Sequence, residues 1–591
     1  MRRGAEEMAD FIRTMKRVFS YARPYIIWFW LTIIFAAGSV SLSLAVPIFI
    51  GDAVDCCVGQ GSVDFGELRK IIFRLLIAVV LSALFQWLMS LCTNRLAFRT
   101  VRDLRSDVFG KLQRVPLSYI DRSTKGGLSS RVINDIEIIS DGLLQGFTQF
   151  FSGVITILGT LIFMLTINVK IALVVVLLTP LSFIAASQIT KMTHRFYLRQ
   201  SELRGRMVSF SEEYAGNQKL VTAMDFCDRA VGQFAQVNSD FSSVGANATF
   251  FSSLANPVTR FVNGLIYAAV GLLGALGAAG HSAFIGAMSV GRLSSFLAYS
   301  NQYTKPFNEI SGVFAELQNA AASAERVFAV LDEEEIPDDS DKLSVNSSDC
   351  SGSVSFDDIS FSYSPETRLI EHLSLDVLPG QRVAIVGPTG CGKSTMINLL
   401  LRFYDPQSGK ILLSGRDSTE ITRDSLRSCF GMVLQETWIF TGTVAQNISY
   451  GKPDATREEI IAAAKAVHAH GFIKRLPNGY DSVISEDSGL SQGQKQLLCI
   501  ARVMLMDPPM LILDEATSSI DLRTEQRIQR AFEKLMTGKT SFVIAHRLST
   551  IKNSDVILVM RDGNIVEKGS HAELMAKNGF YSELYNSQFA S

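Results

Sequence analysis

A glycine-rich phosphate loop is the feature that most constrains this chain. Residues Gly387–Thr395 read GPTGCGKST, a full match to the pattern G-x-x-x-x-G-K-[S/T]. The loop follows an apolar, β-like run at Arg382–Val386 and precedes a helical pattern that begins at Met396. Backbone N–H groups, the helix N-terminus and the charge of Lys393 then converge on one point, which predicts a phosphate site. The alternative is a glycine-rich turn in another kind of α/β domain.

The apolar residues are concentrated in the first half of the chain, whereas the second half has the composition of a soluble α/β domain. A length of 591 residues implies more than one domain. The mean hydropathy is +0.22, and a net charge of −1 gives no indication of nucleic-acid binding. No short apolar stretch with a small-residue cleavage site follows the first residues, so we expect no cleaved signal peptide. The eight cysteines lack the spacing of a zinc site or a redox pair.

Six stretches in the first half are apolar and long enough to cross a bilayer, which takes about 20 helical residues. Before them, residues 8–24 carry apolar positions at helical spacing with Arg13, Lys16 and Arg17 between them. That pattern predicts an amphipathic helix in the membrane interface. Only residues 168–170 separate the third and fourth stretches, which predicts a tight hairpin. The predicted spans are residues 25–50, 71–92, 143–167, 171–190, 258–279 and 293–312.

The sixth stretch is more polar than the others, with a run of polar residues from Ser300 to Lys305. Polar groups in a span are costly unless they face a bundle interior or a water-filled cavity. We therefore expect this helix to line the translocation path. The alternative is that part of it already lies in the cytosol.

Basic residues are concentrated in alternate connections between the spans. The segment before the first span carries six Lys and Arg residues, the connection between spans two and three carries nine, and that between spans four and five carries seven. The other connections carry two, one and, over residues 281–291, none. The positive-inside rule therefore predicts that both termini lie in the cytoplasm.

The two long basic connections have helical patterns, so we expect spans two to five to continue beyond the membrane as cytoplasmic helices. Two turns lie within these connections, at Pro116–Asp121 and at Glu213–Lys219. We interpret both as contacts to a domain that carries a phosphate loop; ordinary loop turns are the alternative.

An acidic stretch that contains proline and serine marks the boundary between the two halves. Together with the predicted helix and spans, this boundary divides the chain into four segments. These are an amphipathic N-terminal helix at 1–24, a transmembrane domain with cytoplasmic extensions at 25–331, a linker at 332–352 and a nucleotide-binding domain at 353–591.

Two further strand-like runs end in polar residues. Residues 510–513 are apolar and are followed by Asp514 and Glu515. A strand-terminal Asp is suited to hold Mg²⁺, and Glu515 can orient or deprotonate an attacking water. His546 follows the apolar run 541–545, and doubly wound folds place ligands at the carboxyl edge of their parallel strands. The alternatives are two exposed charges and a structural histidine.

Residues 490–494 read LSQGQ and predict a second anion site. Ser491 and Gly493 stand before the helical stretch 495–506, and the N-terminus of a helix binds anions. Two anion sites on one domain suggest that two such domains sandwich a nucleotide. Tyr363 lies upstream of the phosphate loop, where its ring could stack on adenine; a simple strand aromatic is the alternative.

In this order the motifs resemble those of the ATP-binding cassette (ABC) transporters. The resemblance covers nearly the whole chain, with six spans and then one cassette, as in a bacterial half-transporter of the exporter type. It implies an all-α transmembrane domain followed by an α/β P-loop ATPase domain, with ATP and Mg²⁺ as cofactors. It also implies an inner-membrane protein in which two cassettes dimerise head to tail around two ATP molecules.

The resemblance assigns roles to single residues. Gln435 would sense the γ-phosphate, Asp521 would couple the two ATP sites, and the two turns would be coupling helices. Glu515 and His546 are the candidate catalytic residues. The candidate ATP-binding residues are Tyr363, Gly387, Pro388, Thr389, Gly390, Cys391, Gly392, Lys393, Ser394, Thr395 and Gln435. The candidate Mg²⁺ ligands are Ser394, Gln435 and Asp514, and the signature that completes the partner's site is Ser491, Gln492, Gly493 and Gln494.

Two departures from the family pattern bear on the partner. Gln492 stands where the family usually has glycine, and the segment 485–489 looks shorter than usual. The hydrolytic set of Lys393, Glu515 and His546 is intact. This mixture is similar to one subunit of the heterodimeric exporters, so we expect a second, different half-transporter as partner; a homodimer stays open. An importer with the exporter fold and an ATP-gated channel or regulator are the alternatives for the function.

The motifs do not identify the transported substrate. Aromatic residues in the spans could line a drug or lipid cavity, although packing and lipid contact are the commoner roles of such residues. They are Phe85, Trp87, Phe147, Phe150, Phe151 and Phe163.

Overall fold

The structure, a computed structural model, describes residues 2–57, 63–278, 288–364, 369–435, 437–486, 488–514, 521–545 and 548–589. The chain forms two compact units. Unit 1 comprises Met1–Val115 and Ser123–Glu334, and unit 2 comprises Pro116–Arg122 and Glu335–Ser591. The short segment Pro116–Arg122 therefore belongs with unit 2, although the chain on both sides of it belongs to unit 1.

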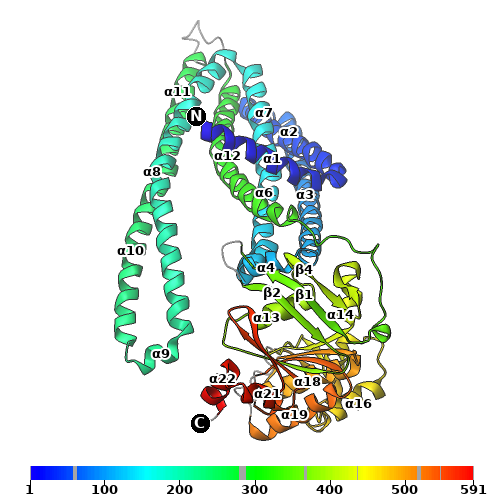
Figure 1. Cartoon of the computed structure of the whole chain (residues 1–591). Coiled ribbons are helices and arrows are strands. Elements are labelled where there is room, and N and C mark those ends of the chain that lie inside the picture. Colours follow the sequence, from blue (N-terminus) through cyan, green and yellow to red (C-terminus); the bar gives the residue numbers. More distant parts are fainter. Residues whose placement is uncertain are drawn as a thin grey trace. The chain divides into compact units, whose positions relative to one another are not determined.

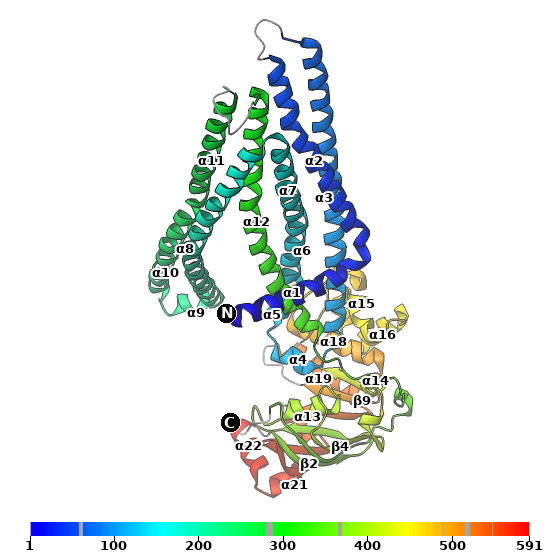
Figure 2. The same cartoon turned by 90° about the horizontal axis from the view of Figure 1, so that it is seen from above.

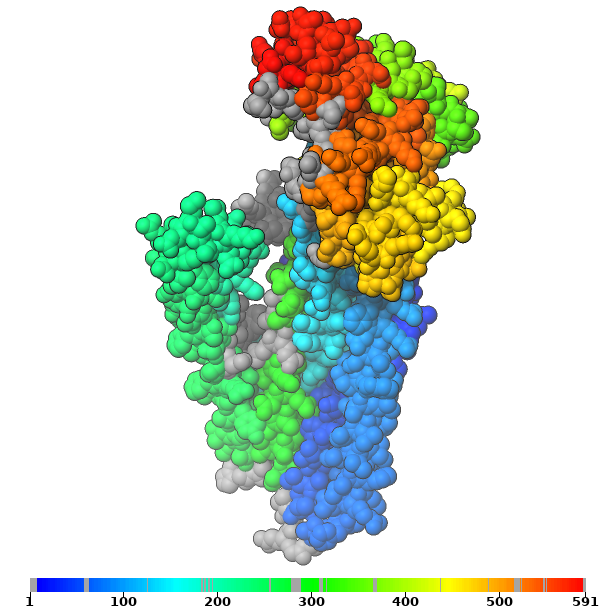
Figure 3. All heavy atoms as spheres, turned by 90° about the horizontal axis from the view of Figure 1, so that it is seen from below, coloured from blue at the N-terminus to red at the C-terminus, as the bar shows by residue number. Residues whose placement is uncertain are grey.

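In its described residues, unit 1 contains helices and no strands (Figure 1). The helices α2 and α3 run side by side, and α7 and α12 pack against α2 (Figure 2). The helices α8 and α10 form a paired arm that stands apart from the α2–α3 pair (Figure 3). The elements are α1 (Arg2–Ala22), η1 (Arg23–Tyr25), α2 (Ile26–Cys57), α3 (Phe65–Leu112), α5 (Lys125–Ser130), the π-helical turn η2 (Arg131–Asp135), α6 (Ile136–Gln145), the π-helical turn η3 (Gly146–Phe150), α7 (Phe151–Ile167), α8 (Val169–Gly216), α9 (Gln218–Ala223), α10 (Cys227–Ser253), α11 (Ala255–Ala278) and α12 (Val290–Leu331).

The predicted number of six membrane spans is not confirmed. Four helical runs in the described part of the chain are long and apolar enough to cross a membrane. A further apolar stretch, Val169–Leu181, is shorter. The helix α12 holds the predicted sixth span, and its polar residues lower its hydropathy. The four runs are Met8–Cys57, Phe65–Leu112, Gly126–Ile167 and Cys227–Gly277.

The helices α2 and α12 meet at a seam of small residues. A Cβ on Gly51 would lie 2.2 Å from the hydroxyl of Ser295, so the two helices touch without a side chain between them. Pro47 lies inside α2, where proline removes a backbone hydrogen bond. The Ser295 hydroxyl donates to the Pro47 carbonyl at 2.7 Å, and the Tyr299 hydroxyl donates to the carbonyl of Leu44. Side chains of α12 therefore satisfy backbone carbonyls beside the proline.

The N-terminal helix α1 is fastened to the end of α12. Arg17 donates two hydrogen bonds to Asp332, at 2.6 and 2.8 Å, and its guanidinium lies 4.1 Å from the ring centroid of Phe328. The hydrogen bond from Arg17 lowers the pKa of Asp332. Nearby, Arg326 of α12 pairs with the buried carboxylate of Asp135 in η2. Planar, bidentate arginine pairs of this kind fix orientation as well as distance.

Unit 2 is built on two large sheets and a short two-stranded one (Figure 1). The larger sheet has the strand order β12-β11-β3-β10-β9-β6, in which β11, β3, β10, β9 and β6 are parallel and β12 is antiparallel. The second sheet, β2-β1-β4-β5, is antiparallel. The strands are β1 (Val354–Phe361), β2 (Ile370–Val377), β3 (Arg382–Val386), β4 (Ser408–Leu413), β5 (Arg416–Asp417), β6 (Phe430–Val433), β7 (Gly442–Thr443), β8 (Val483–Ile484), β9 (Met510–Asp514), β10 (Thr540–Ile544), β11 (Val556–Arg561) and β12 (Asn564–Gly569).

The helices of unit 2 pack on this framework. They are α4 (Leu117–Arg122), α13 (Lys393–Leu400), α14 (Arg423–Ser428), α15 (Val444–Ile448), α16 (Arg457–Ala466), α17 (His470–Ile473), α18 (Gln492–Met506), α19 (Leu522–Met536), α20 (Leu548–Lys552), α21 (His571–Ala576) and α22 (Phe580–Phe589), with the short 3₁₀ turns η4 (Ser347–Asp349), η5 (Ser418–Glu420), η6 (Ser449–Gly451) and η7 (Gly479–Asp481).

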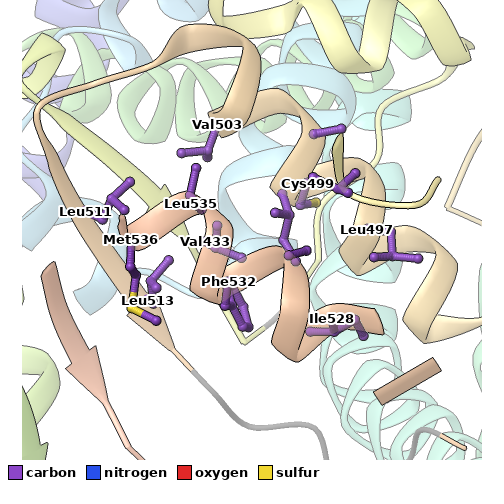
Figure 4. Packing of buried hydrophobic residues seen from close by; sticks show 14 of the residues in the cluster. Val433, Leu497, Cys499, Val503, Leu511, Leu513, Ile528, Phe532, Leu535 and Met536 are labelled. Atoms are coloured by element: carbon purple, nitrogen blue, oxygen red, sulfur yellow. The ribbon is translucent and has the colours of Figure 1, made fainter. Parts of the chain in front are cut away.

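A continuous hydrophobic core holds α18 and α19 against the parallel strands (Figure 4). Leu497 and Val503 of α18 and Phe532 of α19 are buried beside Leu511 and Leu513 of β9. Both faces of a parallel sheet are normally covered in this way, which is why β9 is apolar from Met510 to Leu513, before its last residue, Asp514. The core fixes the start of α18 relative to the edge of the sheet.

Candidate functional site

Four parallel strands end at the same edge of the larger sheet. The register pairs Ile544 of β10 with Ile385 of β3 and with Asp514 of β9, and it pairs Val433 of β6 with Leu513. The segments that follow these strands therefore emerge side by side, as in other α/β folds that bind ligands at this edge. The phosphate loop follows β3, Gln435 follows β6, and Asp514 is the last residue of β9.

The phosphate loop has the predicted strand-loop-helix context, between β3 and α13. At two positions of the loop the backbone requires glycine. Gly392 has φ +98°, a left-handed conformation at the start of α13, and a Cβ on Gly387 would lie 2.3 Å from the carbonyl oxygen of Met560. The loop therefore passes directly against β11.

The remaining loop residues divide into a buried and an exposed set. Cys391 and Thr395 are buried, whereas Pro388, Thr389, Gly390 and Ser394 are exposed. The Lys393 ammonium donates to the carbonyls of Gly387 and Pro388, at 2.7 and 2.9 Å, which keeps its charge at the mouth of the loop. A pocket of about 120 Å³ lies against the loop, between Lys393 and the side chains of α20 and α22.

This arrangement fits a nucleotide phosphate with its cation. Exposed Ser394 in the first turn of α13, exposed Gln435 and half-buried Asp514 offer oxygen ligands, the donor type that Mg²⁺ prefers. The N-terminus of α13 and the Lys393 charge suit the phosphates.

Tyr363 belongs to a cluster of aromatic rings beside α13. Its ring lies 5.0 Å from that of Tyr404, in an edge-to-face arrangement, and its hydroxyl accepts a hydrogen bond from Asn398 at 3.2 Å. The ring is 41% exposed, so one face is available for stacking. The Tyr404 hydroxyl donates to the carboxylate of Asp121 in α4 at 2.5 Å. Burial, and then the bond to Asp121, raises the pKa of Tyr404, so the phenol keeps its proton.

The first predicted turn, Pro116–Asp121, is therefore linked through Tyr404 to the candidate adenine-binding ring within unit 2. The second turn, Glu213–Lys219, lies in unit 1, where Asn217 donates to the Glu213 carbonyl at 2.8 Å. Its contact with an ATPase domain stays a prediction.

The signature residues form the N-terminus of α18. The Ser491 hydroxyl accepts from the backbone N–H of Gln494 at 3.3 Å, and the Gln494 side chain accepts from the N–H of Ser491 at 3.0 Å. This capping box fixes the first turn of the helix, and Gly493 is buried within it. Gln492, the departure from the family pattern, donates to the hydroxyl of Thr437 at 3.1 Å.

A buried lysine holds the segment before the signature. Lys495 donates to the carbonyl and to the carboxylate of Glu486, at 2.6 and 2.9 Å. The hydrogen bond from Lys495 lowers the pKa of Glu486. The start of α18 is thus tied to the preceding segment by Lys495 and to the segment after Gln435 by Gln492.

Asp521 is the N-cap of α19, where its carboxylate accepts from the N–H of Thr524 at 3.0 Å. That bond lowers the pKa of Asp521, and it gives the residue a structural role beside the predicted coupling role. Glu515 and His546, the two candidate catalytic residues, lie outside the described residues.

The sequence reasoning missed three residues of the site: Tyr404, Thr437 and Lys495. The position of Tyr404 could have pointed to it, because it lies only four residues after the helix that follows the phosphate loop. Thr437 and Lys495 gave none, because their partners lie at other places in the chain and are brought near only by folding.

Comparison with known proteins decides the family. Residues 29–307 match the transmembrane region of ABC transporters, and residues 370–518 match the ABC transporter ATP-binding domain. The chain belongs to the ABC transporters. Among its relatives, a fatty acid ABC transporter ATP-binding/permease protein of Mycobacterium bovis is 41% identical over 89% of this chain and 82% of the relative. An uncharacterized ABC transporter ATP-binding protein of Bacillus subtilis is 39% identical over 98% of this chain and 94% of the relative.

The fold has a counterpart among solved structures. A bacterial Atm1-family ABC exporter with ATP bound has a TM-score of 0.76 and 29% identity, over 96% of this chain and 99% of that one. The predicted fold class and family are confirmed. The chain is an exporter-type half-transporter, with a helical transmembrane domain and an ATPase domain, and it is an ATPase coupled to transport.

Lys393→Ala is expected to weaken nucleotide binding by about tenfold or more, because a hydrogen bond to a charged group contributes about 1.5–3 kcal/mol. The measurement is the shift of the melting temperature with nucleotide concentration. Lys452→Ala removes an exposed lysine that pairs with Glu459 at 2.8 Å and serves as the control. Equal shifts in the two variants would contradict the role of Lys393.

Proposed function

We propose that the chain dimerises in the bacterial inner membrane and couples ATP hydrolysis to export of its substrate, with both termini and the ATPase domain in the cytoplasm. The observation that carries the proposal is the edge of the larger sheet, where the phosphate loop, Gln435 and Asp514 emerge together. The signature on α18 supports a second, facing domain, because its exposed Ser491 caps a helix that could receive a partner's phosphate. The alternating basic connections support the orientation.

The residues of the site would have different roles in ATP hydrolysis. Bound Mg²⁺-ATP supplies the phosphoanhydride bond that is cleaved. The glycine loop and Lys393 hold its phosphates, while Ser394, Gln435 and Asp514 hold the cation. Glu515, the residue after Asp514, would orient and deprotonate the attacking water, and His546 would hold that water and the γ-phosphate.

Closure of two facing ATPase domains would change the conformation of the transmembrane domains, and the coupling turns would transmit this change. Ligand binding shifts such an equilibrium only through its different affinity for the open and closed states, and a nucleotide held between two domains provides that difference. Within unit 2, Tyr404 connects Tyr363 with Asp121 of the first turn, so a movement of the adenine-stacking ring reaches α4 through one side chain.

Glu515→Gln is expected to bind ATP and to lower turnover by at least about a hundredfold, because the amide cannot accept the proton of water. Retained nucleotide after rapid gel filtration and steady-state phosphate release measure the two effects. Glu458→Gln, at the start of α16, is the matched control. Undiminished phosphate release by the Glu515 variant would remove Glu515 from the catalytic role.

Tyr404→Phe is expected to lower transport per ATP hydrolysed by about tenfold, since it deletes a hydrogen bond to a carboxylate of about 1.5 kcal/mol. The ring that packs on Tyr363 stays, so nucleotide affinity should remain near that of the unaltered protein. Substrate uptake and phosphate release are measured together in proteoliposomes. Tyr450→Phe, whose ring packs on Trp438, is the control. An unchanged ratio of transport to hydrolysis would show that the hydrogen bond between Tyr404 and Asp121 does not couple transport to ATP hydrolysis.

We also propose that the partner is a different half-transporter. The supporting observation is Gln492, whose side chain is held on Thr437 of its own domain at a position where the family usually has no side chain. The tagged chain expressed alone should hydrolyse ATP weakly and gain activity with its companion subunit. Purification of the chain alone as a fully active dimer would favour the homodimer.

A further inference from the structure

Unit 1 contains an apolar pocket of about 210 Å³ between α1, α12 and the segment from α6 to α7. Its described lining residues are all apolar or glycine, and five of them are phenylalanines. Three of these, Phe147, Phe150 and Phe151, are among the aromatic residues considered from the sequence. Purely apolar cavities of about 150 Å³ stay dry and take up apolar molecules, so this pocket suits a hydrocarbon better than water or a polar group.

The floor and one wall of the pocket are shaped by close helix packing and by a π-helical turn. A Cβ on Gly142 would overlap with the side chain of Ala320, so α6 and α12 touch there without a side chain between them. The turn η3 follows, and such turns within helices are rare and frequent at functional sites. The ring of Phe147 stacks on that of Phe151 at 6.0 Å and meets Phe19 of α1 edge to face at 5.9 Å.

The wall that α1 provides is held in place, so the pocket is preformed. Arg17 is bonded to Asp332 and lies over the ring of Phe328, and the ring of Tyr21 stacks on the same phenylalanine at 6.3 Å. These contacts hold α1 on α12, and the two helices can be followed in Figure 2. A preformed pocket loses less free energy on binding than one that must first be ordered.

The residues after α1 mark the level of the membrane interface. Tyr25, Trp28 and Trp30 follow α1 within a few residues, and Trp and Tyr are enriched where the bilayer meets water. The guanidinium of Arg95 in α3 lies 4.9 Å from the ring centroid of Trp28, which brings a charge to the same level. We therefore infer that α1 lies beside the lipid head groups and that the pocket is within reach of the acyl chains.

The α1 rim of the pocket is basic. Phe19 lines the pocket and is 43% exposed, so the pocket opens at the surface beside it. Lys16 and Arg23 are exposed and lie three residues before and four residues after Phe19, which places them beside it on the helix surface. The acidic residues next to the lining, Asp141 and Glu316, belong to α6 and α12. Positive charge therefore gathers on the α1 side.

We propose that this pocket binds one acyl chain of an anionic phospholipid from the leaflet that α1 faces, and that the lipid phosphate pairs with Lys16 and Arg23. Basic residues at a membrane surface attract anionic lipids, and the apolar lining beside them takes up the chain. A neutral phospholipid would fill the pocket equally well but would gain nothing from the two basic side chains. The site goes beyond the proposed transport function, because it adds a bound lipid that joins α1 to α6 and α12.

Photochemical labelling in lipid nanodiscs tests the site in the full-length protein. The probe is phosphatidylglycerol with a diazirine on one acyl chain, in a phosphatidylcholine bilayer, and mass spectrometry locates the labelled residues. We expect labels on Phe147, Phe151 and Leu317 that unlabelled phosphatidylglycerol displaces. Added phosphatidylcholine with the same chains should need about thirtyfold more lipid, about fivefold for each of the two basic residues. Labels on the exposed residues Leu158 and Ile162 of α7 measure unspecific contact with the bilayer.

Two pairs of variants separate the chain from the head group. Met15→Trp adds a large ring to the pocket lining and should lower pocket labelling at least about tenfold, whereas Ile12→Trp, on the exposed side of the same helix, should not. Lys16→Gln with Arg23→Gln should remove the preference for phosphatidylglycerol over phosphatidylcholine.

The control for the charges is Lys70→Gln with Arg74→Gln, an exposed pair on α3, which should keep that preference. Gel filtration and thermal melting check that each variant is folded, and the competition in the unaltered protein does not depend on any variant.

Two results would overturn the proposal. Pocket residues labelled no more than Leu158 and Ile162 in the unaltered protein would exclude a bound acyl chain. Equal competition by the two phospholipids, or an unchanged preference in the Lys16 and Arg23 variant, would exclude the anionic head group. Both measurements are made without nucleotide, so neither result depends on ATP hydrolysis or transport.

Discussion

The common carboxyl edge of four parallel strands is the constraint on which the ATPase domain depends. The pairings of Ile385 with Ile544, and of Ile544 with Asp514, place the phosphate loop and a strand-terminal carboxylate at the same edge of the sheet. A slip of one residue in any of these pairs would turn its side chains to the other face of the sheet. The buried core beneath α18 and α19 opposes such a slip, because Leu511, Leu513 and Val543 are packed in it. The geometry of the site is therefore a consequence of packing well away from it.

Contacts at the rim of this domain connect the site with other segments. Tyr404 reaches Asp121, Gln492 reaches Thr437, and Lys495 reaches Glu486, each through hydrogen bonds of side chains. The bonds of Tyr404 and Lys495 go to carboxylates, and such charge-assisted hydrogen bonds are shorter and stronger than neutral ones. These bonds fix α4, the segment after β6 and the start of α18 within the ATPase domain.

The transmembrane unit obeys a different constraint, the absence of water in the bilayer core. At the α2–α12 seam, Ser295 and Tyr299 satisfy carbonyls beside Pro47, and this proline is structural. Further along α12, Pro306 has no N–H to donate to the carbonyl of Gln302, and the buried side-chain oxygen of Gln302 has no hydrogen-bond partner. Proline thus interrupts the hydrogen bonding of both helices, and near Pro47 two side chains of α12 bond to carbonyls of α2.

The sequence by itself determined the features that depend on neighbours along the chain. The phosphate loop between β3 and α13, the strand that ends in Asp514 and the helix that starts at the signature follow from local spacing and local conformation. Tertiary structure alone decided the rest. Tyr404 and Asp121 are 283 residues apart, and neither periodicity nor composition pairs them. The unsatisfied oxygen of Gln302 is likewise a property of what packs around α12, because hydrogen bonding and burial depend on atoms that only the fold brings near.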